Sequence, residues 1–300
     1  MTVAYLFAGQ GSQSVGMGKD LAAAFPKAKE LFARASAILE FDLAKVCFEG
    51  PAEELNRTDR CQPALLVHGI ACLEVAAQKG LPPAEAAAGL SLGEYTAHVY
   101  AGSLTFEDGV KLLEQRGRFM QEACDKTPSG MVSILGLDRE KCAEACRGMG
   151  DVGVANLNAP GQIVISGENG ALAKAVEKAK ELGAKRAIPL KVAGAYHSVV
   201  MKPAQEKMQQ ALAAVTVSKP RIPVYANVNA KPLTDPAEIK AALATQICSS
   251  VLWEDSIRAI AAPKYFEFGP GRVLAGLVRK IDDKAEVVSI EGASSVSSTQ

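Results

Sequence analysis

Apolar runs followed by glycine turns and helical spacing recur in the first third of the chain. Residues 3–8 form a short apolar run, which predicts a buried strand. The glycine-rich residues 9–13 follow as a turn, and apolar positions then recur at helical spacing over residues 21–40. A second apolar run at residues 86–88 leads through another glycine turn into a helix at residues 94–100. The repeated strand–turn–helix order predicts an α/β body with a parallel sheet. A further helix is predicted at residues 63–79, with Pro63 in its first turn.

The pattern changes near residue 128. Apolar runs and helical spacing now predict the order strand, helix, strand, strand, helix, strand, which is the split βαββαβ order of a ferredoxin-like unit. The predicted strands are residues 131–137, 152–156, 162–166 and 186–192, and the predicted helices end near residues 149 and 182. We therefore expect residues 128–193 to be a small subdomain inserted into a larger body.

The larger body is expected to comprise residues 1–127 and 194–290. Its second part contains apolar runs at residues 224–228 and 265–268, with a helix predicted over residues 236–248. Residues 291–300 are small and polar, so we expect them to form a flexible tail.

Composition and charge narrow the function classes. The chain has 300 residues, of which 48% are hydrophobic, enough for a large core. Its formal net charge is zero, with 33 basic and 33 acidic residues, so no overall field favours nucleic acid or an anionic membrane as a partner. The start lacks the leader of a secreted protein, and seven scattered cysteines indicate reduced thiols. These features predict a cytoplasmic protein. Cys142 and Cys146 lie on a predicted helix with no second ligand pair at zinc-site spacing, so no metal site is expected.

The turn at residues 89–93 has the Gly-x-Ser-x-Gly pattern of a nucleophile elbow. In such an elbow two glycines permit a sharp turn between a strand and a helix, and the serine is exposed at the helix N-terminus. The predicted strand before Ser91 and the predicted helix after it supply that context. A glycine–serine turn can also be only a turn, but the context favours Ser91 as a nucleophile.

A serine nucleophile needs a base, and the chain has three histidines. His68 lies within a predicted apolar helix. His98 is two helical turns beyond Ser91, about 10 Å along the axis, so direct contact is not expected. His197 follows a predicted buried strand in a loop of small residues, where a substrate could approach. By elimination His197 is the candidate base; the alternative is a loop histidine with a structural hydrogen bond.

A cation lies among the apolar positions of the helix that Thr105 is predicted to cap. Arg116 shares its stripe with Leu112, Leu113 and Met120. Because burying an unpaired guanidinium is costly, Arg116 should meet an anion, either a structural carboxylate or a carboxylate of the substrate. The planar guanidinium suits two-point contact with a carboxylate. Acyl transfer also needs donors for the oxyanion, and the backbone N–H groups of Leu92 and Gln10 are the candidates.

Seven motifs in this order resemble those of the malonyl-CoA:acyl carrier protein transacylases of fatty acid synthesis and the related acyltransferase domains of polyketide synthases. The resemblance covers nearly the whole chain. The motifs are Gly9-Gln10-Gly11-Ser12-Gln13, Ser91-Leu92-Gly93-Glu94-Tyr95, Gln115-Arg116-Gly117, Asn158 through Gln162 to Ser166-Gly167, Gly194-Ala195-Tyr196-His197-Ser198, Gln246 with Val251 and Trp253, and Phe268-Gly269-Pro270-Gly271.

The resemblance implies an α/β-hydrolase-like body with a ferredoxin-like insert and a ping-pong reaction. Ser91 would be acylated, His197 would act as base and then acid, and Arg116 would bind the malonyl carboxylate. A backbone carbonyl at Gln246 would orient His197, and Met120 and Tyr196 would contact the substrate. The implied partners are malonyl-CoA, as a substrate, and an acyl carrier protein; we expect no cofactor and a monomer.

Two positions depart from the family pattern. Leu90 stands where many members have histidine, so the electrostatics beside Ser91 should differ. Tyr196 stands where malonyl-specific members more often have phenylalanine, and its hydroxyl should either narrow the acyl pocket or form a hydrogen bond within it. The alternatives on the same fold are a free-standing polyketide synthase acyltransferase and an acyl hydrolase. An alternative from another class is an inactive scaffold that only binds a carrier protein, which the Ser91, His197 and Arg116 set disfavours.

Overall fold

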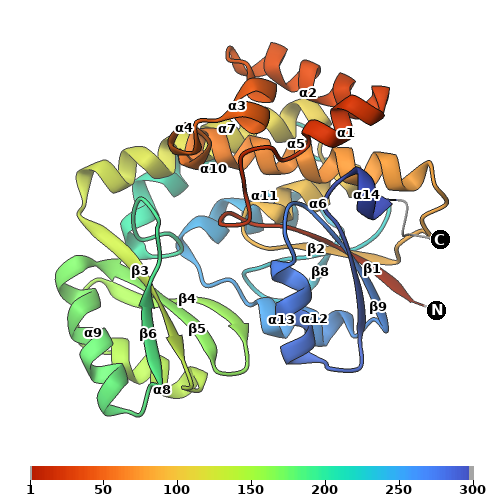
Figure 1. Ribbon diagram of the computed structural model, residues 1–300. Coiled ribbons are helices and arrows are strands. Elements are labelled where there is room, and N and C mark those ends of the chain that lie inside the picture. Colours follow the sequence, from red (N-terminus) through yellow and green to blue (C-terminus); the bar gives the residue numbers. More distant parts are fainter. Residues whose placement is uncertain (1, 297–300) are drawn as a thin grey trace.

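The computed structural model describes residues 2–296, and within them six strands form the larger of two sheets (Figure 1). These strands are β1 (Val3–Phe7), β2 (Ala86–Gly89), β7 (Val224–Tyr225), β8 (Pro232–Leu233), β9 (Lys264–Phe268) and β10 (Glu286–Ile290). Their order across the sheet is β10-β9-β1-β2-β7-β8. Neighbours from β10 to β7 are parallel, and β8 adds an antiparallel edge. The predicted parallel sheet is confirmed.

Helices cover both faces of this sheet, because β1 is apolar on both sides. Tyr5 and Phe7 belong to a core that includes residues of α2, α3, α5, α7, α10 and α11, whereas Ala4 and Leu6 belong to a second core with α12 and α13. The helices of this part are α1 (Lys19–Ala24), α2 (Pro26–Leu39), α3 (Leu43–Glu49), α4 (Ala52–Asn56), α5 (Thr58–Ala77), α6 (Gly93–Ala101), α7 (Phe106–Lys126), α10 (Lys202–Ala213), α11 (Pro236–Thr245), α12 (Trp253–Ile260), α13 (Val273–Ile281) and α14 (Ala293–Val296). Within residues 2–296, no helix combines the length and apolar character needed to cross a bilayer.

The second sheet belongs to the predicted insert and has its own core. Its elements are β3 (Ser129–Leu135), α8 (Arg139–Cys146), β4 (Val152–Ala159), β5 (Gln162–Glu168), α9 (Asn169–Glu181) and β6 (Arg186–Pro189). The strand order is β4-β5-β3-β6, and every neighbouring pair is antiparallel. Ile134, Ile165 and Ala175 pack together between this sheet and its helices. The βαββαβ order predicted from the sequence is confirmed.

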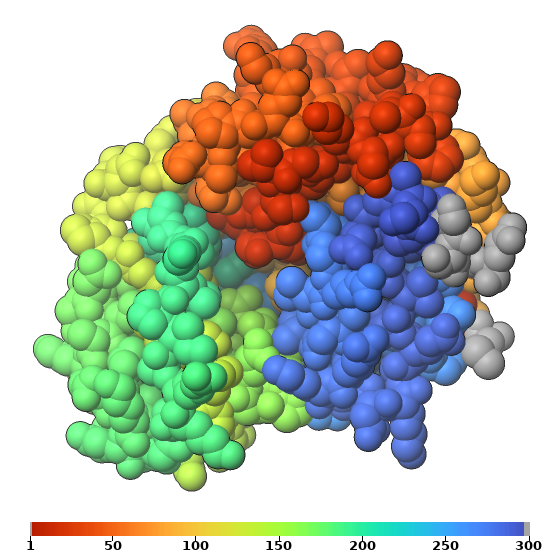
Figure 2. Space-filling model, in the orientation of Figure 1, coloured from red at the N-terminus to blue at the C-terminus, as the bar shows by residue number. Residues whose placement is uncertain are grey.

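Backbone hydrogen bonds connect the insert to the body. The N–H of Leu157 on β4 donates to the carbonyl of Val251 at 2.9 Å, and the N–H of Val251 donates to the carbonyl of Ala155 at 2.8 Å. Arg139 of α8 also pairs with Asp255 of α12 at 2.7 Å. Figure 2 shows the surface hollowed where the N-terminal segment, the insert and the C-terminal part of the body meet.

Two predicted helices have different bounds. The stretch predicted as one helix over residues 21–40 is two helices, because Phe25 is extended (φ −129°, ψ 114°) before Pro26, which starts α2. A proline disfavours helical backbone at the residue before it. The helix predicted to start at Pro63 starts at Thr58, so Pro63 lies inside it.

The end of the chain also differs from the sequence-based prediction. Residues 291–296 were expected to belong to a flexible tail, but residues 293–296 form α14 and Val296 is buried. The carboxylate of Asp20 accepts a hydrogen bond from the N–H of Ala293 at 2.7 Å, and Ser295 Oγ accepts from the N–H groups of Glu291 and Gly292. The Asp20 bond joins the segment to α1, and the Ser295 bonds hold its own turn. Residues 297–300 of the predicted tail lie outside the described residues.

We predict that Gly89→Ala destabilises the protein by about 3 kcal/mol, because an added Cβ would lie 1.9 Å from the carbonyl carbon of Gly93. Gly276→Ala in α13 is the matched control. It meets no atom within 4 Å and should stabilise the helix by up to about 1 kcal/mol. Urea unfolding of both variants measures the difference. Equal unfolding midpoints would contradict the close approach of β2 to α6.

Candidate active site

Ser91 occupies a sharp turn between β2 and α6. Its φ is 55°, in the left-handed region that a residue with a Cβ rarely adopts. An added Cβ at Gly93 would lie 2.3 Å from the carbonyl oxygen of Phe7, so the start of α6 packs directly on β1. The N–H of Ser91 donates to Asn227 Oδ1 at 2.7 Å. The turn therefore has the geometry of the predicted nucleophile elbow.

His197 lies against the serine hydroxyl. Its Nε2 is 2.8 Å from Ser91 Oγ, and its Nδ1 is 2.9 Å from the backbone carbonyl of Gln246. Because a carbonyl only accepts, Nδ1 carries the proton and Nε2 is left to accept from the serine. Burial, and then the charge of Arg116, lowers the pKa of His197 to about 4. The imidazole is therefore neutral at pH 7, as a base must be.

The other two histidines have separate surroundings. His98 is buried, its Nδ1 lies 3.3 Å from Ser103 Oγ, and burial lowers its pKa to about 3. His68 is buried beside the thiol of Cys72, and burial lowers its pKa to about 4. Neither contacts Ser91, in agreement with the elimination from sequence.

Arg116 of α7 brings a positive charge to the nucleophile. Its side chain is only 1% exposed. Nη2 donates to Ser91 Oγ at 3.1 Å and to Gln246 Oε1 at 2.9 Å, while Nη1 donates to Gln62 Oε1 at 2.8 Å. Its guanidinium carbon lies 5.7 Å from the centre of the Tyr95 ring. Within residues 2–296, no carboxylate forms an ion pair with Arg116, and Nε has no hydrogen-bond partner. The sequence analysis left two possible partners for Arg116, a structural carboxylate or a carboxylate of the substrate. Among the described residues, no structural carboxylate is in direct contact with it.

Gln62 of α5 links Arg116 to Met120. Its Oε1 accepts from the guanidinium, and its Nε2 lies 3.4 Å from Met120 Sδ. Met120 is 1% exposed and belongs to the main core, so it supports Arg116 through Gln62. Contact of Met120 with a substrate stays a prediction.

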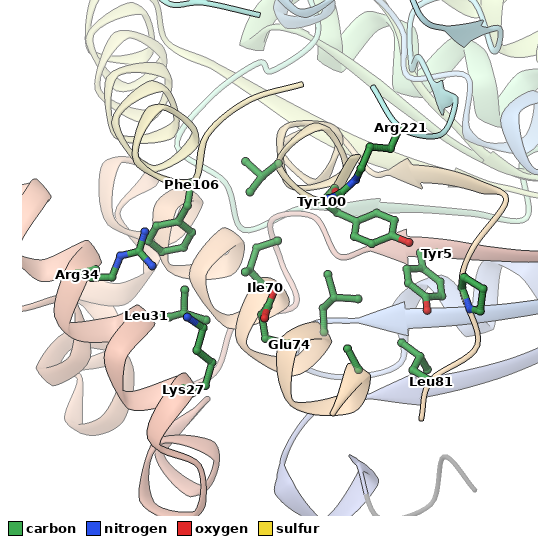
Figure 3. Close-up of a pocket in the computed structure, with 14 residues that line it drawn as sticks. Tyr5, Lys27, Leu31, Arg34, Ile70, Glu74, Leu81, Tyr100, Phe106 and Arg221 are labelled. Carbon is green, nitrogen blue, oxygen red and sulfur yellow. The ribbon is translucent and has the colours of Figure 1, made fainter. Parts of the chain in front are cut away.

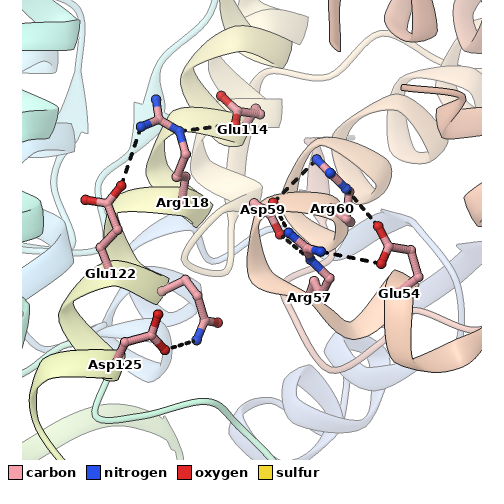
Figure 4. A network of polar contacts seen from close by, with 9 residues as sticks. Glu54, Arg57, Asp59, Arg60, Glu114, Arg118, Glu122 and Asp125 are labelled. Carbon is pink, nitrogen blue, oxygen red and sulfur yellow. Dashed lines mark hydrogen bonds and ion pairs between the residues drawn. The ribbon is translucent and has the colours of Figure 1, made fainter. Parts of the chain in front are cut away.

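A surface network fixes the start of α5, from which Thr58 and Gln62 reach the site (Figure 4). Asp59 accepts from Arg57 at 3.0 Å and pairs with Arg60 at 3.4 Å, and Arg60 also bonds Glu54 at 3.0 Å. Isolated exposed ion pairs contribute little to stability, but a shared network restrains the geometry of the chain. The same close-up shows the exposed Arg118 between Glu114 and Glu122, with which it forms ion pairs on α7.

Tyr196 and Gln10 lie together at the edge of the site. The hydroxyl of Tyr196 is 2.8 Å from Thr58 Oγ1. Burial raises the pKa of Tyr196, and the neighbouring side chains of Thr58 and Gln10 oppose that shift. The loop that carries Gln10 packs on the elbow, because an added Cβ at Gly9 would lie 2.6 Å from the carbonyl oxygen of Leu90. The N–H of Leu92 lies at the N-terminus of α6, where backbone N–H groups lack partners within the helix. The hydroxyl of Tyr196 was predicted either to narrow the acyl pocket or to form a hydrogen bond, and in the structure it bonds with Thr58.

Three buried polar residues of the site were not predicted from the sequence. These are Gln62, Glu94 and Asn227. Asn227 follows β7, and the carboxyl ends of parallel strands are where sites form in open α/β sheets. Glu94 directly follows the elbow at the first turn of α6. The positions of Asn227 and Glu94 in the sequence could therefore have indicated a place in the site, whereas no local pattern distinguishes Gln62.

A separate cavity of about 500 Å³ lies away from these residues (Figure 3). Tyr5, Ile70, Tyr100 and Arg221 are among its lining residues, and no residue of the Ser91 site lines it. Among residues 2–296, no group of three His, Cys, Asp or Glu side chains is placed to hold a metal ion.

Known proteins share both the sequence and the fold. The model of the acyl transferase domain family matches residues 4–268. The malonyl CoA-acyl carrier protein transacylase of Bacillus subtilis (strain 168) is 45% identical over 295 residues, covering 96% of this chain and 93% of that protein. The transacylase of the same name from Escherichia coli (strain K12) is 44% identical over 286 residues, covering 93% of each.

Two solved structures superpose closely. An acyl carrier protein S-malonyltransferase from Vibrio cholerae O1 has a TM-score of 0.96 and 41% identity, with 100% of both chains covered. A malonyl-transacylase in complex with its type II polyketide synthase acyl carrier protein has a TM-score of 0.96 and 39% identity, covering 100% of this chain and 99% of that one.

We predict that Tyr196→Phe lowers the free energy of unfolding by about 1 kcal/mol, because Thr58 Oγ1 loses a buried hydrogen-bond partner. Tyr225→Phe is the control at a partly buried tyrosine of the second core, and it should change stability by less than about 0.5 kcal/mol. Chemical denaturation of both variants provides the comparison. The same small change in both would show that the Thr58 bond does not stabilise the fold.

Proposed function

Because the chain belongs to the acyl transferase domain family, and within it to the malonyl CoA-acyl carrier protein transacylases, we propose that it transfers malonyl from malonyl-CoA to an acyl carrier protein. The observation that carries this proposal is the buried guanidinium of Arg116, 3.1 Å from Ser91 Oγ and without a carboxylate partner in the described residues. The substrate carboxylate would complete its hydrogen bonds. The proposed site is thus suited to an acyl group that ends in a carboxylate.

The first half-reaction forms a malonyl ester on Ser91. As Oγ attacks the thioester carbonyl, His197 Nε2 takes the hydroxyl proton. Backbone N–H groups of Gln10 and Leu92 are the proposed donors to the oxyanion. The tetrahedral intermediate collapses, the C–S bond breaks, and coenzyme A leaves as a thiol with the proton from His197.

The second half-reaction reverses these roles. The phosphopantetheine thiol of the carrier protein gives its proton to His197 as its sulfur attacks the ester carbonyl. When the C–O bond breaks, the proton returns to Ser91 Oγ. The carbonyl of Gln246 holds Nδ1 throughout, so no carboxylate is required behind the histidine. His197 is the proton carrier in both halves, so we propose that no metal or organic cofactor takes part.

The wider role follows from the product. A carrier-bound malonyl thioester is an extender unit, and we propose that this protein supplies it for fatty acid synthesis in the cytoplasm. Supply of polyketide synthesis is the second candidate, because one structural neighbour is a malonyl-transacylase bound to a polyketide carrier protein. We also propose that the protein works as a monomer.

Ser91→Ala should abolish the covalent intermediate. After brief exposure to malonyl-CoA, intact-mass measurement of the wild-type protein should show the addition of one malonyl group, and the variant should show none. Ser250→Ala is the control, since this serine donates to the backbone carbonyl of Val154, away from the elbow. An adduct that persists in Ser91→Ala would overturn the assignment of the nucleophile.

Arg116→Ala should lower kcat/KM for malonyl-CoA by about a hundredfold and reduce the preference for malonyl-CoA over acetyl-CoA, because acetyl has no carboxylate for the guanidinium. Arg118→Ala is a matched control on the same helix, with an exposed side chain that pairs with Glu114 and Glu122. The control should keep the wild-type ratio of malonyl to acetyl transfer. Equal losses of both activities in Arg116→Ala would contradict a role in carboxylate binding.

A further inference from the structure

A fully buried carboxyl group lies directly behind the nucleophile and has no part in the proton transfers above. It belongs to Glu94, in the first turn of α6. Its Oε2 accepts from the backbone N–H of Asn227 at 3.0 Å and from Gln246 Nε2 at 2.5 Å. Its Oε1 has no hydrogen-bond partner in the described residues. Placing such a group in the interior costs free energy, which packing alone does not explain.

The two donors to Glu94 are the residues that hold the strained turn. Asn227 Oδ1 accepts from the N–H of Ser91 at 2.7 Å, and Asn227 Nδ2 donates to the carbonyl of Gly89 at 2.8 Å. Gln246 Nε2 donates to the carbonyl of Ser91 at 3.0 Å. Both backbone polar groups of Ser91 are therefore held by residues that Glu94 in turn binds, Asn227 through its backbone N–H and Gln246 through its side chain.

Gln246 also reaches the other two functional groups. Its Oε1 accepts from Arg116 Nη2 at 2.9 Å, and its backbone carbonyl accepts from His197 Nδ1 at 2.9 Å. The side-chain amide must point one way for this to work, with Nε2 toward Glu94 and Oε1 toward Arg116. The reverse orientation would place an N–H donor against the donors of the guanidinium.

A carboxylate enforces that orientation, because it only accepts hydrogen bonds. A neutral carboxylic acid or an amide at the same position could also donate, so Glu94 would no longer oppose the reverse orientation and only Arg116 and the Ser91 carbonyl would do so. We propose that Glu94 is a positioning residue of the acyl transfer, whose negative charge fixes the amide of Gln246 and, through it, Ser91 and Arg116. This inference rests on the proposed function, because the acyl transfer in question is the malonyl transfer described there.

The charges around Glu94 give the proposal a pH dependence. Arg116 from α7 and the neighbouring Tyr95 are the titratable groups that interact with this carboxyl in the described structure. Burial raises the pKa of Glu94 to about 7, against the opposing effects of the bonds from Asn227 and Gln246 and the charge of Arg116. His197, with its pKa lowered to about 4, stays neutral over the same range. Between pH 8 and pH 6 the charge that changes in the site is therefore that of Glu94.

The experiment compares wild type with Glu94→Gln, and uses Glu74→Gln as the control. Glu74 is a partly buried glutamate of α5 that lines the separate cavity. For malonyl transfer to holo carrier protein, wild-type kcat/KM should be about tenfold lower at pH 6 than at pH 8, since protonation removes the charge. Glu94→Gln should be about tenfold slower than wild type at pH 8 and nearly flat between pH 6 and 8. Glu74→Gln should follow the wild type.

Thermal unfolding of the same variants separates positioning from a structural role. The pKa of Glu94 is raised by folding, so its contribution to stability is fully present at low pH and is lost as pH rises through about 7. Glu94→Gln keeps an acceptor oxygen for both donors and removes the buried charge. At pH 8 the variant should unfold at the same temperature as wild type or higher, because the cost of burying the charged Glu94 exceeds its attraction to Arg116, although the activity of the variant is lower. Loss of stability together with activity at every pH would overturn the proposal in favour of a structural role.

A second reaction tests the role of Glu94 without any malonyl substrate. Phenylmethanesulfonyl fluoride forms an O–S bond with Ser91 Oγ as the S–F bond breaks, fluoride leaves and the hydroxyl proton passes to His197. The rate of Ser91 sulfonylation in wild type should fall between pH 8 and pH 6, and should be pH-independent in Glu94→Gln. If malonyl transfer is absent but this pattern holds, the proposed function fails and the positioning role stands. A wild-type rate that does not change between pH 8 and 6, or equal rates for Glu94→Gln and Glu74→Gln, would overturn the role of Glu94.

Discussion

The buried guanidinium of Arg116 is the charge on which the arrangement of the site depends. It lies in the interior with only neutral partners in direct contact among the described residues, namely the amides of Gln62 and Gln246, the hydroxyl of Ser91 and the ring of Tyr95. An uncompensated cation in such a place destabilises the fold by several kcal/mol. The carboxyl of Glu94, separated from it by one amide, attracts the guanidinium without occupying it, although the cost of burying that carboxylate exceeds this attraction and raises its pKa. The cation is thereby held in the protein yet kept available to a substrate carboxylate.

The strained conformation of Ser91 follows from the same network. A left-handed φ at a residue with a Cβ costs about 1–2 kcal/mol, so the surroundings must impose it. Gly89 and Gly93 allow β2 and α6 to meet closely, and Asn227 and Gln246 bind the two backbone groups of the serine. Because β1 and β2 are buried in the centre of the sheet, this turn has a rigid support. The hydroxyl is thus presented to His197 at 2.8 Å.

Much of the fold could be predicted from the sequence, because its signals are local. Apolar runs and glycine turns predicted a parallel sheet with strands near β1, β2, β7 and β9 and the βαββαβ order of the insert, and the elbow pattern with elimination among three histidines predicted Ser91 and His197 as candidates. Pro26 splits a helix that periodicity alone joins, which is a local effect that the proline itself signals. Other differences depended on tertiary context, because α14 is ordered by contacts with Asp20 from the other end of the chain. Gln62 and Asn227 come from α5 and from the end of β7, so only the folded chain shows that they meet at Ser91.

The most direct test of this account is a crystal structure of the protein trapped as its malonyl ester, after a short soak with malonyl-CoA. The account predicts density for a malonyl group on Ser91 Oγ, with both carboxylate oxygens within hydrogen-bond distance of the Arg116 guanidinium and the Gln246 amide in the orientation described above. A malonyl group on another residue, or one on Ser91 whose carboxylate points to solvent or to a different cation, would contradict it.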